Sequence, residues 1–383
     1  MIKAALIGTG NIAQQHIRGF LAYPRRCKIE VLADIYPESA EETKNRHGLD
    51  AEVYSDYRKV LDRSDIDLVD ICGPPHTHAE ISIAALDSGK HVLVEKPMAA
   101  SLADCDAMLK AVKRSGRTLS VVAQNRFRPA LMNLKTILDT GLAGDIVHVQ
   151  VNSYWWRGHS YYDLWWRGTW EKEGGGCTLN HAVHHIDALI WMMGMPYDVL
   201  AVMGNTSHDN AEVEDLSMSF VRFENGALGQ ITASVVHHGE EQELIFQGKN
   251  ARVSAPWKVC ASSAKQNGFP VKNDDLQQRI KGYYATLPRI EFAVPHQGQI
   301  NDVLQAIEDG KDPLIRGEDG KNTLELITAI YKSAITGEKV TLPLAKEDPF
   351  YTMEGILSRA PRFYKKSASV VKFDDNDITI GNI

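Results

Sequence analysis

The sequence is poor in cysteine and has no long apolar run. Its 383 residues include five cysteines, which are scattered and form no C-x-x-C pair, so neither a disulfide framework nor a cysteine-based zinc site is expected. No apolar run approaches the roughly 20 residues that span a bilayer, and the N-terminus has no apolar region of signal-peptide length. These absences predict a cytoplasmic protein without a membrane partner.

Basic residues are outnumbered by acidic ones, 42 lysines and arginines against 49 aspartates and glutamates. The formal net charge is −7, and no segment concentrates lysine and arginine into a stripe that could follow a phosphate backbone. Nucleic acid is therefore not expected as a partner. With 44% apolar and 24% charged residues, the composition is that of a globular protein long enough for two domains.

The first 122 residues alternate short apolar runs with helical patterns. Most of these runs lack the alternation of a half-exposed strand, as in "KAALIG", "IEVLAD", "LVDICG", "HVLVEK" and "TLSVVA". Continuous apolar runs are typical of parallel strands buried on both faces. With helices between them, they predict an α/β domain over residues 1–122, a Rossmann fold with a doubly wound parallel sheet.

After residue 123 the pattern changes to strands that alternate by two. The stretch "LSMSFVRFENGALGQITASVV" is two such runs joined by Asn225-Gly226, the strongest short signal for a hairpin. Another pair surrounds Lys249-Asn250. Residues 123–344 are expected to form an α+β substrate and oligomerisation domain with a large, mainly antiparallel open sheet. Amphipathic helices near 300–309 and 322–336 are expected to flank and close it.

Residues 345–383 are expected to form a C-terminal extension. The stretch is mixed in composition and ends in the acidic "KFDDNDITIGNI". An arm that packs on a neighbouring subunit and a loose tail are both compatible with this composition.

A glycine-rich turn follows the first predicted strand. In "GTGNIA", Gly8, Gly10 and Ala13 match the G-x-G-x-x-G/A pattern that opens a helix and receives a pyrophosphate. Asp34 ends the second strand 24 residues after Gly10, where a carboxylate bonds ribose hydroxyls and repels the 2′-phosphate of NADP. NAD is therefore favoured over NADP, with Asp34 as a mere helix cap as the alternative. The expected cofactor contacts here are Gly8, Thr9, Gly10, Asn11, Ile12 and Asp34.

A lysine stands at the carboxyl end of another predicted strand. In "HVLVEKPMA", Glu95, Lys96 and Pro97 fall on the sheet edge where open α/β sheets bind ligands. A lysine beside a nicotinamide could hold a reacting oxygen and stabilise developing negative charge. Taken alone, Lys96 would be interpreted as a surface residue.

Several motifs together resemble the Gfo/Idh/MocA family of oxidoreductases. They are "GTGNIAQQH", "CGPPHTHAEISIAALDSGKHVLVEKPMA", "NRFRP", "GLAGDI", "WRGTWEKEGGG", "NHAVHHID" and "YKSAITGEKVTLPL". The resemblance implies an NAD(P)-dependent enzyme that acts on sugars, inositols or sugar derivatives and assembles as a homodimer or homotetramer. It also implies that Lys96 is catalytic. The residues implied to lie near the nicotinamide half of the cofactor are Gly73, Pro74, Pro75, His76, Glu95, Lys96, Asn125 and Arg167.

The stretch "GGGCTLNHAVHHID" carries three histidines. On one continuous helix, Asn180, His184, Asp187 and Trp191 would share a stripe, with His181 and His185 on a neighbouring one. The family pattern of an acid or amide followed four residues later by histidine falls on Asn180 and His184. We expect His184 to accept the substrate's hydroxyl proton while Lys96 stabilises the alkoxide.

The remaining polar groups of this stretch have lesser expected roles. Asn180 cannot accept a proton, so it is expected only to orient the substrate or Lys96. His181 and His185 have a zinc-helix spacing, but the glutamate of H-E-x-x-H and a third ligand are missing. We therefore expect no metal, with His181 as a substrate contact and His185 as a structural residue.

An aromatic segment, "YWWRGHSYYDLWWRGTW", holds five of the seven tryptophans. A core or a subunit contact would also be rich in aromatics. Interleaved arginines favour a substrate wall instead, because sugar rings lie on aromatic faces while arginine bonds their hydroxyls. The expected substrate contacts are Arg126, Arg157, Tyr162, Trp166, Asn180, His181 and His184.

Three functions are compatible with these motifs. The first is an NAD-dependent dehydrogenase of a sugar, cyclitol or sugar-derived alcohol. The second is a redox-neutral enzyme that oxidises its sugar transiently with tightly held NAD, followed by elimination, epimerisation or glycoside cleavage. The third is a non-catalytic nucleotide-sensing regulator, which would have no need of Lys96 and His184.

Overall fold

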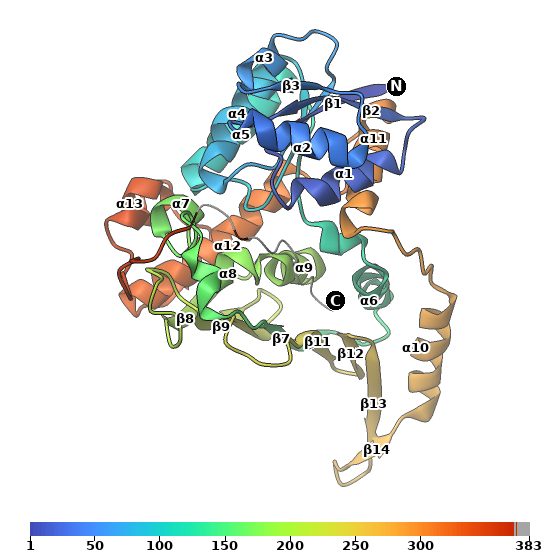
Figure 1. Ribbon diagram of the computed structural model, residues 1–383. Coiled ribbons are helices and arrows are strands. Elements are labelled where there is room, and N and C mark those ends of the chain that lie inside the picture. Colours follow the sequence, from blue (N-terminus) through green and yellow to red (C-terminus); the bar gives the residue numbers. More distant parts are fainter. Residues whose placement is uncertain (371–372, 374–383) are drawn as a thin grey trace.

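The computed structural model describes residues 1–370 and 373. Two sheets form the frame of the molecule, and helices lie between them (Figure 1). The chain builds the first sheet, crosses to the second, and then sends one late helix back to the first domain. This crossing places the candidate site between the two domains.

The first sheet has six parallel strands in the order β3-β2-β1-β4-β5-β6, which confirms the predicted doubly wound Rossmann sheet. The strands are β1 (Ile2–Ile7), β2 (Cys27–Ala33), β3 (Glu52–Tyr54), β4 (Leu68–Ile71), β5 (His91–Val94) and β6 (Leu119–Val121). The helices are α1 (Ala13–Leu21), α2 (Pro37–His47), α3 (Arg58–Leu61), α4 (Pro75–Asp87) and α5 (Leu102–Ser115).

Strand β1 separates two apolar clusters, one on each face of this sheet. Ala4 and Leu6 belong to one cluster, and Ala5 and Ile7 to the other. Alternate side chains of a strand point to opposite faces, so a central strand covered on both sides must be apolar throughout. This explains the unbroken apolar runs in the sequence.

Helix α11 (Pro295–Asp309) occupies an unexpected place. Its apolar residues Ile300, Val303 and Leu304 are buried with Ala4 and Ile17 of the first domain. The prediction that this helix closes the second sheet is therefore wrong. Helical periodicity identifies the apolar face of a helix, but it does not identify the surface that covers that face.

The second sheet has nine strands in the order β14-β13-β12-β11-β7-β10-β9-β8-β15. Its only parallel pair among the described strands is β7 with β10, so the predicted mainly antiparallel sheet is confirmed. The strands are β7 (Ile146–Tyr154), β8 (Asp198–Gly204), β9 (Leu216–Arg222), β10 (Leu228–Ser234), β11 (Gln242–Gly248), β12 (Ala251–Ala255), β13 (Lys258–Ala264), β14 (Pro270–Lys272) and β15 (Val340–Thr341).

Both predicted hairpins are present. Leu228 of β10 pairs with Arg222 of β9 across the Asn225-Gly226 turn, where Gly226 has a φ of +85°. That value lies in the left-handed region, which glycine adopts without steric cost. Strands β11 and β12 pair around Lys249-Asn250.

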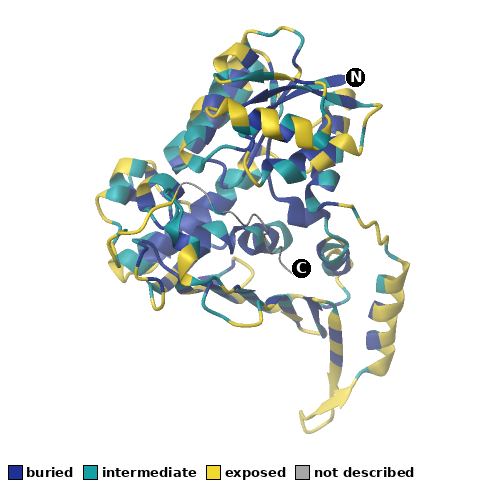
Figure 2. Ribbon diagram, viewed as in Figure 1, coloured by how far each residue is buried: buried dark blue, intermediate teal, exposed yellow. Residues whose placement is uncertain are grey.

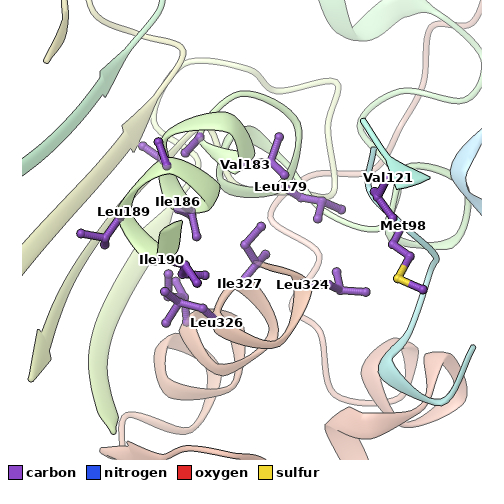
Figure 3. Packing of buried hydrophobic residues seen from close by; sticks show 14 of the residues in the cluster. Met98, Val121, Leu179, Val183, Ile186, Leu189, Ile190, Leu324, Leu326 and Ile327 are labelled. Carbon is purple, nitrogen blue, oxygen red and sulfur yellow. The ribbon is translucent and has the colours of Figure 1, made fainter. Parts of the chain in front are cut away.

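Helices cover one face of the second sheet. The helices of this half are α6 (Pro129–Asp139), α7 (Trp170–Glu173), α8 (Cys177–Asn180), α9 (Val183–Met193), α10 (Asp274–Thr286), α12 (Gly317–Thr336) and α13 (Met353–Leu357), with 3-10 turns η1 (Gln124–Phe127), η2 (His159–Asp163) and η3 (Pro349–Tyr351). Figure 3 shows α9 packed on α12 through Ile186, Ile190 and Ile327, with Met98 and Val121 of the first domain in the same cluster. This shared core joins the two domains.

The opposite face of the sheet carries exposed apolar side chains. Leu200 and Val202 of β8 are 46% and 65% exposed, and Met218 and Phe220 of β9 are 45% and 63% exposed. Strands β13 and β14 and helix α10 extend from the same sheet as an arm (Figures 1 and 2), whose surface is mostly exposed. In the part of the chain that the structure describes, no helix is long and apolar enough to cross a membrane.

The C-terminal extension packs on its own chain as far as residue 370. Phe350 and Tyr351 are buried, the indole N–H of Trp170 donates to Pro361 O at 2.7 Å, and Val370 N–H donates to Asp163 O at 2.7 Å. Most of the acidic end, "KFDDNDITIGNI", lies outside the described residues. The extension up to residue 370 is thus packed against its own chain and is not a loose tail.

Candidate active site

The turn between β1 and α1 has the geometry that a dinucleotide needs. Gly8 has a φ of +92°, and a Cβ there would lie 2.9 Å from Gly73 N, so only glycine fits against the loop after β4. At Gly10 a Cβ would meet nothing within 4 Å. No side chain caps the start of α1, which leaves its first N–H groups for an anion such as a pyrophosphate. These residues therefore fit an NAD cofactor.

Asp34 is held in place at the end of β2. Its Oδ2 accepts hydrogen bonds from both Thr9 N–H and Thr9 Oγ1 at 2.8 Å, and its Oδ1 accepts from Tyr36 N–H at 2.9 Å. Helix α2 begins at Pro37 after Tyr36, so Asp34 is not its cap. The alternative that Asp34 merely caps this helix is wrong, and the carboxylate is oriented beside the glycine turn.

A cavity of about 790 Å³ opens between the domains, next to this sheet edge. It is lined by residues from β5, η1, the aromatic segment, the α8–α9 region and the start of α11. The predicted site residues that line it are Ile12, Glu95, Lys96, Asn125, Arg157, Arg167, Asn180, His181 and His184. The remaining predicted cofactor residues lie along the carboxyl edge of the first sheet, in the turns after β1, β2 and β4 and in the first turn of α4.

Arg126 was expected to contact the substrate, and this prediction is wrong. Its side chain is 2% exposed, and its guanidinium forms ion pairs with Asp187 at 2.8 Å and Asp319 at 3.2 Å. The guanidinium also lies over the ring of Trp191. Arg126 therefore stabilises the contact of η1 with α9 and α12, outside the cavity.

Two aromatic predictions are also wrong. Tyr162 is 1% exposed and packs edge-on against the ring of His208, while the neighbouring Tyr161 lines the cavity. Trp166 does not line it, and its ring lies 4.2 Å from the guanidinium carbon of Arg167. The segment coils into η2, so alternation along a strand could not tell which aromatics face inward.

Lys96 is partly buried and lines the cavity. Its Nζ donates a hydrogen bond to the main-chain carbonyl of Asn180 at 3.0 Å, across the domain interface. Burial lowers the pKa of Lys96, and the nearby Glu95 carboxylate opposes that effect. The lysine therefore joins the first domain to the α8–α9 region at the cavity.

The histidine stretch is not one continuous helix. Helix α8 ends at Asn180 and α9 begins at Val183, so the predicted stripe of four residues is interrupted. The Asn180 amide donates to Gly175 O at 3.0 Å and to Gly176 O at 3.3 Å. Its side chain braces the glycine loop, and it is the carbonyl of Asn180, not its side chain, that contacts Lys96.

The three histidines have different surroundings. His184 lines the cavity, and burial, followed by the charge of Lys96, lowers its pKa well below 6.5. His181 also lines the cavity, and its Nδ1 has no hydrogen-bond partner among the described residues. His185 Nδ1 lies 2.9 Å from Ser153 Oγ, a structural contact. No close group of three metal-ligand side chains in the described ranges includes any of these histidines.

Arg167 and Tyr161 form part of the cavity wall with a buried carboxylate behind them. The Arg167 guanidinium bonds to Tyr161 Oη and lies 3.1 Å from Glu173. Burial raises the pKa of Glu173 to about 7. Trp155, Trp156, His238 and Glu240 complete this wall, and the density of aromatics was the sequence signal for it.

Sequence reasoning missed two buried histidines behind Lys96. His16 of α1 contacts Asp70 at 2.8 Å and Glu95 at 2.9 Å, and His296 of α11 lies 3.3 Å from Glu95. His16 belongs to the quoted motif "GTGNIAQQH", but no spacing rule indicated its partners. Only the fold brings α1, β4, β5 and α11 together at this point.

Comparison with known proteins agrees with this geometry. A model described as the oxidoreductase family, NAD-binding Rossmann fold, matches residues 2–123. A model described as the oxidoreductase family, C-terminal alpha/beta domain, matches residues 135–342. The chain belongs to the Gfo/Idh/MocA oxidoreductase family. Its first domain is accordingly an NAD-binding Rossmann domain.

Relatives within the Gfo/Idh/MocA family act on sugars and cyclitols. Levoglucosan dehydrogenase of Pseudarthrobacter phenanthrenivorans is 30% identical over 64% of this chain and 70% of that protein. Myo-inositol 2-dehydrogenase of Thermotoga maritima is 24% identical over 87% of this chain and 96% of that protein. The chain therefore belongs to a family whose members include dehydrogenases of sugars and cyclitols.

Solved structures of the same family have the same fold. The WlbA dehydrogenase of Bordetella pertussis, in complex with NADH and UDP-GlcNAcA, matches with a TM-score of 0.78 and 27% identity, covering 90% of this chain and 98% of that one. A levoglucosan dehydrogenase in complex with NADH and levoglucosan matches with a TM-score of 0.77 and 26% identity, covering 90% of this chain and all of that one, at 100%. Both comparison structures hold NADH.

Proposed function

We propose that the protein is an NAD-dependent dehydrogenase of a sugar, cyclitol or sugar-derived alcohol. One observation carries the proposal: Lys96 and His184 line the same cavity, between the carboxyl edge of an NAD-binding sheet and an aromatic wall. A ligand there would meet an ammonium group and an imidazole from one side and aromatic rings from the other. A nucleotide sensor would have no use for the lysine and the histidine.

The two polar groups divide the chemistry between them. When bound, the nicotinamide supplies a hydride acceptor. His184, whose pKa burial and Lys96 lower well below 6.5, is a neutral base at pH 7 and accepts the hydroxyl proton of the substrate. Lys96 donates a hydrogen bond to the same oxygen and stabilises the alkoxide that forms. The carbonyl of Asn180 holds the ammonium in place through the 3.0 Å hydrogen bond.

The cavity wall supports a polyol substrate. Trp155, Trp156 and Tyr161 offer aromatic faces, on which the C–H faces of a sugar ring can lie. Arg157, Arg167 and His181 stand among them and can bond hydroxyl groups. Relatives named for levoglucosan and myo-inositol extend the substrate range from sugars to cyclitols.

A screen of sugars and cyclitols for NADH absorbance at 340 nm tests the proposal. Wild-type protein should reduce NAD with at least one polyol, and Lys96→Ala should lower kcat by ~10² or more while NADH still binds, on the scale of losing one transition-state donor. If no polyol gives reduction while the cofactor binds, the dehydrogenase proposal fails. Conversion of a sugar without net NADH, by protein that retains its cofactor, would indicate the redox-neutral class instead.

We further propose that the exposed apolar face of the second sheet pairs with another copy of the chain. The four side chains that form it, Leu200, Val202, Met218 and Phe220, lie on adjacent strands. Contiguous exposed apolar surface marks an interaction site, and a two-fold axis lets one face cover itself. A homodimer, or a homotetramer built from two such pairs, follows.

A further inference from the structure

A chain of buried titratable groups runs behind the cavity wall. His16 Nδ1 lies 2.8 Å from Asp70 Oδ2, and His16 Nε2 lies 2.9 Å from Glu95 Oε1. His296 Nε2 is 3.3 Å from the same Glu95 oxygen. The side chains of His16 and Asp70 are fully buried, and that of Glu95 is 6% exposed. No step of the proposed reaction accounts for these groups.

The two contacts of His16 fix its charge. A neutral imidazole has one N–H, so one of its nitrogens would turn a lone pair toward a carboxylate oxygen. An imidazolium donates from both nitrogens and satisfies both carboxylates. Burial alone would lower the pKa of His16, but the charge of Asp70 raises it, and the net pKa lies well above 6.5.

The other groups around His16 are consistent with this charge. Burial opposes ionisation of Glu95, but the hydrogen bond from His16 and the His296 imidazole 3.3 Å away hold its pKa well below 4.5. Cys72 lies beside His16 and also raises the pKa of that histidine, while burial raises the pKa of the Cys72 thiol to about 12. Burial likewise lowers the pKa of His296, whose ring lies 4.6 Å from that of His16. The cluster thus holds one imidazolium between two carboxylates.

Glu95 connects this cluster to Lys96. Glu95 Oε2 accepts a hydrogen bond from the main-chain N–H of Lys96 at 3.0 Å. Its negative charge also opposes the loss of the lysine proton that burial favours. Glu95 therefore holds the backbone of Lys96 and favours its charged form. Farther along the cavity wall, Arg167 lowers and Glu173 raises the pKa of the same lysine. His16, with His296 beside it, holds the Glu95 carboxylate ionised.

We propose that His16 is a positioning residue: as an imidazolium between Asp70 and Glu95, it locks the Glu95 carboxylate onto the backbone N–H of Lys96 and keeps the lysine ammonium charged. The role given to Lys96 rests on the proposed function. The charge of His16 and its effect on Glu95 do not depend on any substrate, so they can be tested separately.

The substrate-independent test is ¹⁵N NMR of histidine-labelled protein with NADH bound. We expect an imidazolium signal at pH 8 that is missing from His16→Gln, with NADH affinity within a few-fold of wild type. His208 is also buried between two acceptors, Asp215 and Arg157 O. The signal of His16 is therefore assigned by comparing the spectra of wild type and His16→Gln. Absence of any imidazolium signal that the substitution removes would overturn the proposal. A stoichiometric divalent metal in purified protein would also overturn it, because an ion would replace the proton.

The kinetic test follows the alkaline limb of the pH profile with any polyol that the screen identifies. Loss of the imidazolium lets Glu95 take up a proton, so His16→Gln should lower kcat by about tenfold and move the loss of activity to lower pH, with little change in KM. Glu95→Gln should reproduce the shift. Because both act through one group, the double variant should be no worse than Glu95→Gln alone.

His208→Gln is the matched control for removing a buried histidine. His208 contacts Asp215 rather than Glu95, so the alkaline limb of the pH profile of His208→Gln should coincide with that of wild type. If the alkaline limb stays unchanged in both His16→Gln and Glu95→Gln, or if their effects on kcat are fully additive in the double variant, the proposal is overturned.

If His16→Gln does not fold, Glu95→Gln still decides, because removing that carboxylate should change the ¹⁵N signal of His16 and move the alkaline limb of the pH profile. A failed polyol screen would count against the proposed function and leave the NMR outcome valid.

Discussion

Lys96 Nζ donates its hydrogen bond to the main-chain carbonyl of Asn180, at 3.0 Å. The amide side chain of the same residue points the other way and donates to Gly175 O and Gly176 O. Asn180 is therefore an anchor for the lysine and a brace for the glycine loop. It occupies the acid-or-amide position of the family pattern, with an amide side chain that cannot accept a proton.

Asn180→Asp should not improve the enzyme. A carboxylate cannot donate to the two glycine carbonyls, and placing acceptors against them costs ~1–3 kcal/mol of stability. We expect a lower midpoint in urea unfolding and no gain in kcat. A variant that is as stable as wild type and turns over faster would show that an acid at this position can take part in proton transfer.

The activity should have a bell-shaped dependence on pH. In the proposed reaction the base is neutral His184, and because its pKa is lowered well below 6.5, kcat/KM should fall only at pH values below 6.5. The proposed reaction also needs the Lys96 ammonium, whose pKa is lowered from 10.5, so the alkaline limb should lie below pH 10.5. His184→Asn should abolish the acid limb. An acid limb above pH 6.5 in wild type would contradict the assignment of the base.

Arg126 and Arg157 should separate stability from substrate binding. Arg126→Met leaves Asp187 buried without its partner, which should cost ~3–5 kcal/mol in urea unfolding. Arg157 lines the cavity and pairs with the partly exposed Glu240, so Arg157→Gln should cost less stability than Arg126→Met and should raise KM. A raised KM for folded Arg126→Met at unchanged stability would return Arg126 to the substrate site.

Asp34 should set the cofactor preference. Wild type should bind NADH at least ~10-fold more tightly than NADPH, since a carboxylate beside the 2′-phosphate is a like-charge contact. Asp34→Ser with Ile35→Arg should reverse the order, because Ile35 is 77% exposed and an arginine there can reach a phosphate. Fluorescence titration of both cofactors measures the change. Equal affinities in wild type would contradict the role of Asp34.

The exposed sheet face should carry the oligomer. Phe220 pairs with Leu200 on the adjacent strand, so Phe220→Asp places a negative charge in the middle of the apolar face. This variant should be monomeric when its mass is measured by size exclusion coupled to light scattering. Phe269 is comparably exposed, at 67%, but it lies on the arm near β14. Phe269→Asp is therefore the control that should leave the mass unchanged. A monomeric wild type would refute the pairing of this face.

Local patterns predicted much of the fold. Continuous apolar runs identified the parallel strands, and Asn225-Gly226 identified a hairpin that the structure confirms. Helical periodicity also located the apolar face of α11, yet it assigned that face to the wrong sheet. A period of 3.6 residues records that a face is buried, but the same face can be covered by any apolar surface of suitable shape.

Side-chain identity alone determined which residues had the right chemistry for the site: the glycines and Asp34 for a dinucleotide, Lys96 and His184 for proton and charge handling. Tertiary structure decided which of the candidates share a cavity. Arg126 and Tyr162 had suitable chemistry but are buried elsewhere, and His16 and His296 join Glu95 from helices far apart in the sequence. Direction and burial of a side chain depend on contacts between distant segments, and these contacts form only when the chain folds.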